Sequence, residues 1–258
     1  MLAVDVDGEA VQEWFNRESG SPSRLHKLSQ CLTGAMLVGV RRGVLEALPW
    51  AELTLPREKA HEPIFLDTDQ VRAIADACHG WGAGRKDEMK HAGWYGPMVW
   101  FLATTGVRIS EALAMDVRHI VRRRVGGQDV WRGRVVTSKG GVSRDVPVPP
   151  KVLKMLDLSR PKDAPLFVTP LGVRVTKDNW RARAWRAALE EAKLHEVALR
   201  PHDLRHTAIS WAIADGADIK AVQRMAGHKS AKTTFDVYGH LWDAGLDDVA
   251  SRMDARLG

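Results

Sequence analysis

Cysteine is scarce in this sequence. The 258 residues include two cysteines, Cys31 and Cys78, which stand far apart and form no CxxC pair. A framework of disulfides and a thiolate zinc site are therefore both excluded. Such sparing use of cysteine is typical of a reducing compartment, and we expect a cytoplasmic protein.

Long apolar runs are missing as well. Nowhere do eighteen apolar residues follow one another, and the N-terminal stretch MLAVDVDGEAV has neither the basic start nor the apolar run of a signal peptide. The sequence therefore predicts neither a membrane span nor export. It also contains no fixed-period repeat and no low-complexity tract.

The charge balance is moderately basic. Lys and Arg number 38 against 32 Asp and Glu, a formal net charge of +6. Such an excess favours a polyanionic partner such as nucleic acid, although many proteins carry it as an ordinary solvated surface. The positions of individual residues must therefore decide between the two.

Hydrophobic periodicity predicts a mainly α protein with a small antiparallel β-sheet, an α+β fold. Residues 1–50 show the apolar spacing of two or three helices. The proline-bracketed stretch Leu53–Pro63 has no periodicity and is typical of a linker. Residues 130–149 carry β-branched residues on both sides of a Gly-Gly pair, which predicts a β-hairpin with Lys139 near its tip.

Helical spacing dominates the remainder of the chain. One helix is expected to begin at Asp67 or Thr68, and another to stop at Thr105-Gly106, where glycine permits a positive φ. The next helix places Arg108 in its first turn, where side chain and backbone amides could face one anion. Further helices are expected over residues 107–115, 180–193, 204–214, 219–225, 233–241 and 246–257.

Residues 201–211, PHDLRHTAISW, are the densest group of chemically capable side chains. On a helix, His202 and Arg205 share a face and could present an imidazole and a guanidinium to one phosphate. An isolated HxxR more often satisfies a helix end or a surface ion pair. His202 and His206 also have the spacing of a zinc site, but the glutamate of HExxH is missing and Arg205 lies between them, so no metal is expected.

Tyr238 is one of two tyrosines and lies ten residues after His228. A tyrosine usually packs with its polar tip at the surface, and Tyr95 is interpreted in that way. A phenol has a reference pKa of about 10, so a nucleophilic tyrosine needs a base or concentrated positive charge nearby. The histidines and arginines of this region could supply both.

Five short segments carry a resemblance to a known family: TGVRISE at 105–111, SKGG at 138–141, HDLRHT at 202–207, GHKS at 227–230 and TTFDVYGH at 233–240. They resemble, in the same order, the boxes of the tyrosine recombinases, the integrase and Xer family. The resemblance covers roughly residues 62–245, and five ordered matches are far more specific than any one of them.

The resemblance implies a role for each matched residue. Arg108 and Arg205 would clamp the non-bridging oxygens of the scissile phosphate, and His228 would hydrogen-bond it. Lys139 would protonate the departing 5′ oxygen. The remaining roles fall to the tyrosine and its neighbours: Tyr238 as nucleophile, His202 as acid or base toward it, and Glu111 as the supporting acidic residue.

The physical chemistry agrees with these roles. Attack on a phosphodiester builds negative charge on the equatorial oxygens, which preorganised cations stabilise. Exchanging a phosphodiester for a 3′-phosphotyrosine conserves bond energy, and there is no GxxxxGK[ST] loop. Neither ATP nor another cofactor is therefore expected.

The predicted function is site-specific DNA recombination by an integrase of a mobile element, acting on double-stranded DNA. Two alternatives remain: nicking and resealing by a type IB topoisomerase or resolvase, which product analysis would separate, and a truncated DNA-binding relative without catalysis. The second is disfavoured because all six catalytic positions hold competent residues.

The resemblance also bears on domains and assembly. Residues 62–258 would be the catalytic domain, and residues 1–61 a partial or compact helical DNA-binding domain with its linker, shorter than is general in the family. The last helix would pack on its own domain or dock on a neighbouring protomer in a tetramer. Five arginines near the hairpin are interpreted as contacts to the DNA backbone rather than a solvated patch: Arg122, Arg123, Arg124, Arg132 and Arg134.

Overall fold

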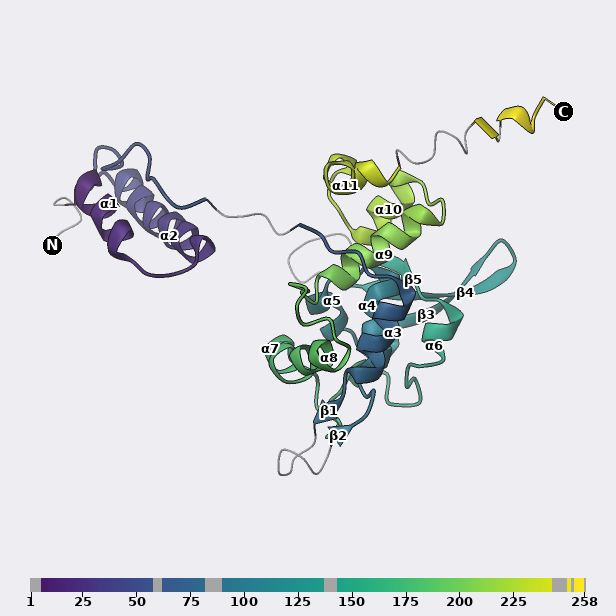
Figure 1. Ribbon diagram of the computed structural model, residues 1–258. Coiled ribbons are helices and arrows are strands. Elements are labelled where there is room, and N and C mark those ends of the chain that lie inside the picture. The colour runs from purple at the N-terminus through teal and green to yellow at the C-terminus, as the bar shows by residue number, and fades with distance from the viewer. Residues whose placement is uncertain are drawn as a thin grey trace. The chain divides into compact units, whose positions relative to one another are not determined.

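The computed structural model describes residues 6–57, 62–81, 90–136, 143–242, 250–251 and 253–257. The chain divides into two compact units, Met1–Glu62 and Pro63–Gly258. Each unit has its own hydrophobic core (Figure 1).

The first unit contains two helices in its described part, α1 (Gly8–Arg17) and α2 (Pro22–Arg41). The side chain of Asp7 accepts a hydrogen bond from an amide of the first turn of α1, and Ser21 does the same for α2. Their apolar faces meet in a small core of Val11, Phe15, Leu25, Met36 and Trp50. The helical character predicted for residues 1–50 is confirmed.

Helix α4 (Gly96–Thr105) lies at the centre of the second unit, packed between α3 (Thr68–Ala77) and α9 (Asp203–Ala214). It is apolar on nearly all sides, as expected of a helix without a solvent face. It ends where predicted, at Gly106, whose φ of +64° is readily adopted by glycine. This helix end lies beside the candidate site described below.

A three-stranded antiparallel sheet forms a second layer, with strands β3 (Ile120–Val125), β4 (Gln128–Val135) and β5 (Arg144–Pro147) in that order. Strands β4 and β5 form the predicted hairpin, but residues 137–142, Lys139 among them, lie outside the described residues. The sequence reasoning missed β3. Its signal was the turn Gly126-Gly127, where both residues have positive φ, as a tight hairpin requires.

Helices α9, α10 (Ile219–Ala226) and α11 (Ala231–Tyr238) are grouped at one end of this unit (Figure 1). A small apolar cluster holds them together: Ile209, Ile213, Val222, Ala226 and Tyr238. The tyrosine is therefore the last residue of a helix that packs on the helices carrying its polar neighbours.

Shorter elements complete the second unit. The helix predicted over 180–193 is built from three consecutive segments, and β1 with β2 forms a two-residue ribbon that the sequence reasoning missed. The remaining bounds are β1 (Gly80–Trp81), β2 (Lys90–His91), α5 (Ile109–Leu113), η2 (Val117–His119), α6 (Pro150–Leu153), α7 (Lys177–Trp180), η3 (Arg181–Trp185, a π-helix), α8 (Arg186–Glu191) and η4 (Gly239–Leu241).

The helix predicted over 246–257 falls largely outside the described residues, which include only 250–251 and 253–257 of that stretch. Of these, 250–251 and 253–254 are helical. Among the described helices, none is both long and apolar enough to cross a membrane.

Candidate nucleic-acid cleavage site

Arg205 is the buried centre of the site. Its side chain rises from the first turn of α9, and the residue is only 3% exposed. Nη1 donates to the carbonyl oxygen of Gly106 at 2.5 Å, and Nη2 donates to that of Ala226 at 2.7 Å. These carbonyls end α4 and α10, where helix dipoles are negative and a guanidinium is favoured. Three elements far apart in sequence thus meet at one cation.

His228 follows α10 and contacts the same guanidinium. Its Nε2 lies 3.0 Å from Arg205 Nη2, and its Nδ1 lies 2.8 Å from Thr234 Oγ1. A guanidinium can only donate, so Nε2 must accept and Nδ1 must carry the proton. Burial and the charges of Arg205, Arg108 and Arg144 lower the pKa of His228 to about 4. The ring is therefore neutral near pH 7, with a single tautomer.

Glu111 joins two further arginines. Its carboxylate accepts from Arg108 Nη1 at 3.0 Å and from both terminal nitrogens of Arg144, at 2.9 and 2.7 Å. Partial burial raises the pKa of Glu111, but hydrogen bonds from Arg144 and Arg108 and the charges of both outweigh it and bring that pKa to about 2. We call Arg108, Glu111, Arg144 and Arg205 the arginine cluster; it holds three positive charges and one negative.

Arg108 is the exposed member of this cluster, with 42% of its side chain accessible. It was predicted in the first turn of a helix and lies one position earlier, at the N-cap of α5, where its backbone amide donates to Glu111 Oε2 at 2.8 Å. That amide therefore serves the carboxylate of its own helix, and the guanidinium is the group of Arg108 that is open to an external anion.

Tyr238 is buried, with 2% of its surface exposed, and its hydroxyl lies 2.6 Å from Nδ1 of His206. Burial raises the pKa of Tyr238 to about 12 against the opposing charge of Arg205. An unassisted hydroxyl with that pKa is almost fully protonated at neutral pH. The neighbouring imidazole is placed to receive its proton.

The imidazole beside the hydroxyl differs from the expected one. The resemblance directed His202 toward the tyrosine, whereas the observed contact is made by His206, and the two histidine rings lie 5.0 Å apart. Desolvation and the charges of Arg205 and Arg108 lower the pKa of His202. His202 thus lies beside the arginine cluster, and His206 lies between His202 and the tyrosine. The sequence reasoning had weighed His206 only as a metal ligand.

Arg144 was also missed. Its side chain is 11% exposed and reaches Glu111 and, through Nε, the carbonyl oxygen of Met225 at 3.1 Å. No motif signals such a residue; its position at the start of the second strand of the hairpin is the one available hint. Of the predicted site residues, the structure brings together Arg108, Glu111, His202, Arg205, His228 and Tyr238, while Lys139 lies outside the described residues.

The arginines of the sheet are only partly free. Arg122 pairs with Asp129, and Arg123 and Arg134 share Asp145. The register places Arg123, Arg132 and Arg134 on the same face, because Arg123 lies opposite Val130 and β-strands alternate with a period of two. That face carries three arginines against one aspartate.

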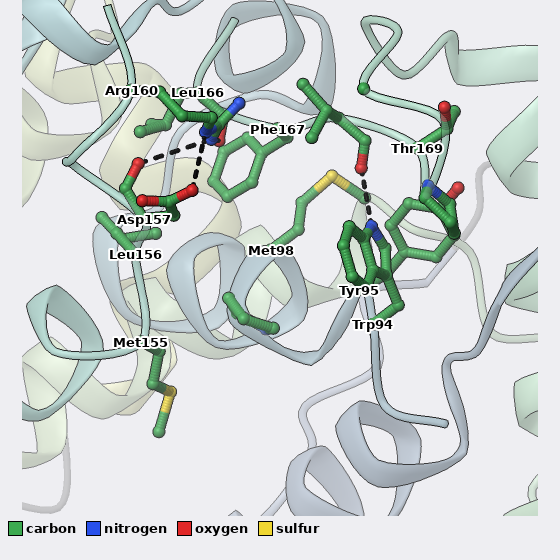
Figure 2. Close-up of a pocket in the computed structure, with 14 residues that line it drawn as sticks. Trp94, Tyr95, Met98, Met155, Leu156, Asp157, Arg160, Leu166, Phe167 and Thr169 are labelled. Carbon is green, nitrogen blue, oxygen red and sulfur yellow. Dashed lines mark hydrogen bonds and ion pairs between the residues drawn. The ribbon is translucent and has the colours of Figure 1, made fainter. Parts of the chain in front are cut away.

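A separate hollow of about 380 Å³ lies elsewhere in the second unit (Figure 2). Its lining is largely apolar; Trp94 donates from its indole to the carbonyl of Val168, and Arg160 pairs with Asp157. None of the predicted site residues lines it. Among the described residues, no group of three or more His, Cys, Asp or Glu side chains could hold a metal ion.

Comparison with known proteins identifies the family of the chain. The model of the phage integrase family matches residues 64–244. The chain is 29% identical over 229 residues to the tyrosine recombinase XerC of Pseudomonas putida, covering 86% of this chain and 70% of that protein. It is 30% identical over 232 residues to XerC of Azotobacter vinelandii, covering 86% and 71% respectively.

Solved structures share the fold. The Tn1549 transposon integrase in complex with circular intermediate DNA matches with a TM-score of 0.67 at 18% identity, over 98% of this chain and 86% of that one. The XerH site-specific recombinase bound to its difH substrate matches with a TM-score of 0.64 at 18% identity, over 97% and 73%. The predicted α+β fold is thereby confirmed. The chain belongs to the phage integrase family of tyrosine recombinases, enzymes that cleave and rejoin DNA in site-specific recombination.

Proposed function

We propose that Tyr238 is the nucleophile of this recombinase. Its phenolic oxygen attacks the scissile phosphorus, a phosphorus–oxygen bond to tyrosine forms, and the bond to the 5′ oxygen breaks. The phenolic proton passes to a base and the leaving oxygen takes a proton from an acid. One phosphoester replaces another, so rejoining needs no external energy source.

The contact of 2.6 Å between Tyr238 and His206 carries this proposal. A buried phenol whose pKa lies near 12 is a poor nucleophile until its proton is removed. Nδ1 of His206 is within hydrogen-bond reach of the proton, the first requirement of a general base. His206 is therefore assigned the acceptance of that proton, and His202, beside it, a place in the same proton network.

Arg108 and Arg205 are proposed to hold the scissile phosphate directly, and His228 is proposed to join them after a change of tautomer, in which Nε2 leaves Arg205 and donates to the phosphate. The hydrogen bonds found in the described part of the chain use three of the five N–H donors of Arg205, so two remain for a ligand. Arg108 adds an accessible guanidinium. The fixed positive charges of Arg108 and Arg205 would stabilise the negative charge that develops on the equatorial oxygens of the phosphate.

Lys139 is proposed as the acid that protonates the 5′ oxygen. The proposal rests on its place in the SKGG segment of the hairpin that joins β4 to β5. Arg144 lies opposite Val135, in the strand pair next to the segment of the sequence that contains Lys139. A positioned acid typically contributes a hundredfold or more toward so basic a leaving group.

The protein binds DNA, and the finer features of that binding are proposals. We assign the helices of residues 1–61 to grip DNA outside the cleavage site, with residues 62–258 as the catalytic domain. The arginine-bearing face of the sheet would contact the phosphate backbone. The C-terminal segment would join neighbouring protomers into a tetramer on the DNA, and integration or excision of a mobile element would be the biological use.

A suicide substrate tests the nucleophile. On DNA nicked beside the cleavage site, the released fragment diffuses away and the covalent protein–DNA adduct accumulates on denaturing gels. Tyr238→Phe should abolish the adduct while leaving DNA affinity within about threefold of wild type, because only the hydroxyl is lost. Tyr95→Phe, the matched change at the other tyrosine, should leave the adduct intact. An adduct formed by Tyr238→Phe would refute this assignment.

A further inference from the structure

Arg144 holds three segments of the site together. It is the first residue of β5, and only Ser143 separates it from the stretch 137–142 that contains Lys139. Its guanidinium contacts Glu111 in α5 and the carbonyl of Met225 at the end of α10. No other residue in the described part of the chain joins the hairpin, α5 and α10 through one side chain.

The contact with Glu111 is the stronger of the two. Two parallel hydrogen bonds of 2.9 and 2.7 Å make it bidentate, and both side chains are 11% exposed. Such a pair has a defined geometry as well as a favourable energy. Because Glu111 also accepts from the side chain and backbone of Arg108, the orientation of Arg108 depends on Arg144 through this carboxylate.

The contact with Met225 fixes the other side of the site. The carbonyl of Met225 accepts from Arg144, and the next carbonyl along the chain, that of Ala226, accepts from Arg205. Gly227 and His228 follow immediately. Arg144 and Arg205 are thereby held by consecutive residues at the end of α10. The turn that carries His228 starts at this same helix end.

Gly227 shows how closely Arg144 approaches this turn. A Cβ placed on Gly227 would lie 2.7 to 2.8 Å from the guanidinium of Arg144, and the φ of Gly227 is +68°. A side chain here would be strained and would push the guanidinium away. The backbone therefore leaves room for Arg144 at a position where any other residue would exclude it.

We propose that Arg144 is a positioning residue for the cleavage reaction: it locks the start of β5, the Arg108–Glu111 pair and the turn of His228 into one arrangement before DNA binds. It acts on the phosphate through these residues. This inference rests on the function proposed above. It predicts a defect in the chemical step rather than in DNA affinity.

The first test is a split between rate and affinity. Arg144→Gln should lower the single-turnover rate of adduct formation at saturating DNA about 100-fold, the usual scale for a displaced catalytic group, with Kd changed less than about threefold. Arg144→Lys should recover part of the loss, because it keeps the charge but cannot make the bidentate contact and the bond to Met225 together. A rate for Arg144→Gln within threefold of wild type would overturn the inference, as would a Kd that rises by as much as the rate falls.

The second test asks whether Arg144 acts through Glu111. Glu111→Gln keeps the shape of the side chain and removes its charge. If the two residues form one unit, the double variant should be no slower than the slower single variant, within about threefold. If the fold reductions in rate of the two single variants instead multiply in the double variant, Arg144 acts independently of Glu111, and this part of the inference is overturned.

Arg160→Gln is the matched control. Arg160 also pairs with a carboxylate, that of Asp157, and donates to three backbone carbonyls, but it lines the separate hollow of Figure 2. It should cleave at the wild-type rate although it loses the same charge. Thermal unfolding of each variant identifies any that fails to fold. If Arg144→Gln does not fold, the cleavage rates of Arg144→Lys and Glu111→Gln test the inference in its place. Wild-type protein run alongside separates the two proposals: absence of its adduct refutes the proposed function, whereas an adduct undiminished in Arg144→Gln refutes this inference alone.

Discussion

Replacing His206 with asparagine should change the pH dependence of cleavage as well as its rate. Asparagine places an amide atom near the position of Nδ1, so the hydrogen bond to Tyr238 can persist, but an amide cannot accept the proton at these pH values. The variant therefore separates proton removal from the holding of the hydroxyl. A general base typically contributes between about 10² and 10⁴ in rate, and we expect a deficit of about 10³ at pH 7.

The raised pKa of Tyr238 sets the form of that dependence. With a pKa of about 12, the ionised fraction of the phenol at pH 7 is about 10⁻⁵ and increases tenfold with each pH unit. Without a base, cleavage must draw on this fraction, so the rate of His206→Asn should increase about tenfold per unit between pH 6.5 and 9.5. The wild-type rate should rise less steeply, since the imidazole removes the proton during attack. The gap between the two proteins should therefore narrow as pH rises.

Single-turnover adduct formation on the nicked substrate, measured across this range, provides the readout. His119→Asn is a suitable control, because Nδ1 of His119 also makes one defined hydrogen bond, from the amide of Asp116 at 2.8 Å, away from the tyrosine. It should follow the wild-type profile. Parallel profiles for wild type and His206→Asn would refute the assignment of His206 as the base.

Two further predictions concern stability. The pKa of Glu111 is lowered from 4.5 to about 2 in the folded protein, so its contribution to the free energy of unfolding is present above pH 4.5 and is lost as pH falls toward 2. In urea titrations, the difference in the free energy of unfolding between wild type and Glu111→Gln should decrease by up to about 3 kcal/mol over this pH range. A difference that stays constant with pH would contradict the reasoning. Gly106→Ala adds a Cβ at a position where φ is +64° and where Met225 lies 3.1 Å away. The substitution should lower the free energy of unfolding by about 1 to 2 kcal/mol in the same assay. An unchanged free energy of unfolding would show that the turn relaxes.

The general fold and many local features were accessible from the sequence. The stop of α4 at Gly106 followed from the conformational freedom of glycine, and the helical spacing of residues 219–225 and 233–241 anticipated α10 and α11 closely. Strand β3 was missed because its three consecutive arginines were interpreted as a basic surface for the DNA backbone and not as part of a strand. The Gly126-Gly127 turn was the stronger signal, since two consecutive positive φ values are characteristic of a tight hairpin.

The site shows a different limit of prediction from sequence. Motif matching identified the residues that share a short segment, but not which of His202 and His206 would reach a tyrosine more than thirty positions later, because that depends on how α11 packs on α9. Arg144 was beyond reach for a similar reason. Its three hydrogen bonds end on α5 and α10, and a single arginine beside a strand gives no sign of partners so distant in sequence.

The end of α10 joins two guanidinium anchors in adjacent peptide units. Opening of that single last turn would release Arg144 from Met225 and Arg205 from Ala226 in one event, since neighbouring carbonyls of a fraying helix are lost together. The free energy of this local opening therefore determines the fraction of molecules in which the pocket is assembled before DNA binds, independently of the global stability of the protein. Amide hydrogen exchange in the last turn of α10 measures that quantity directly.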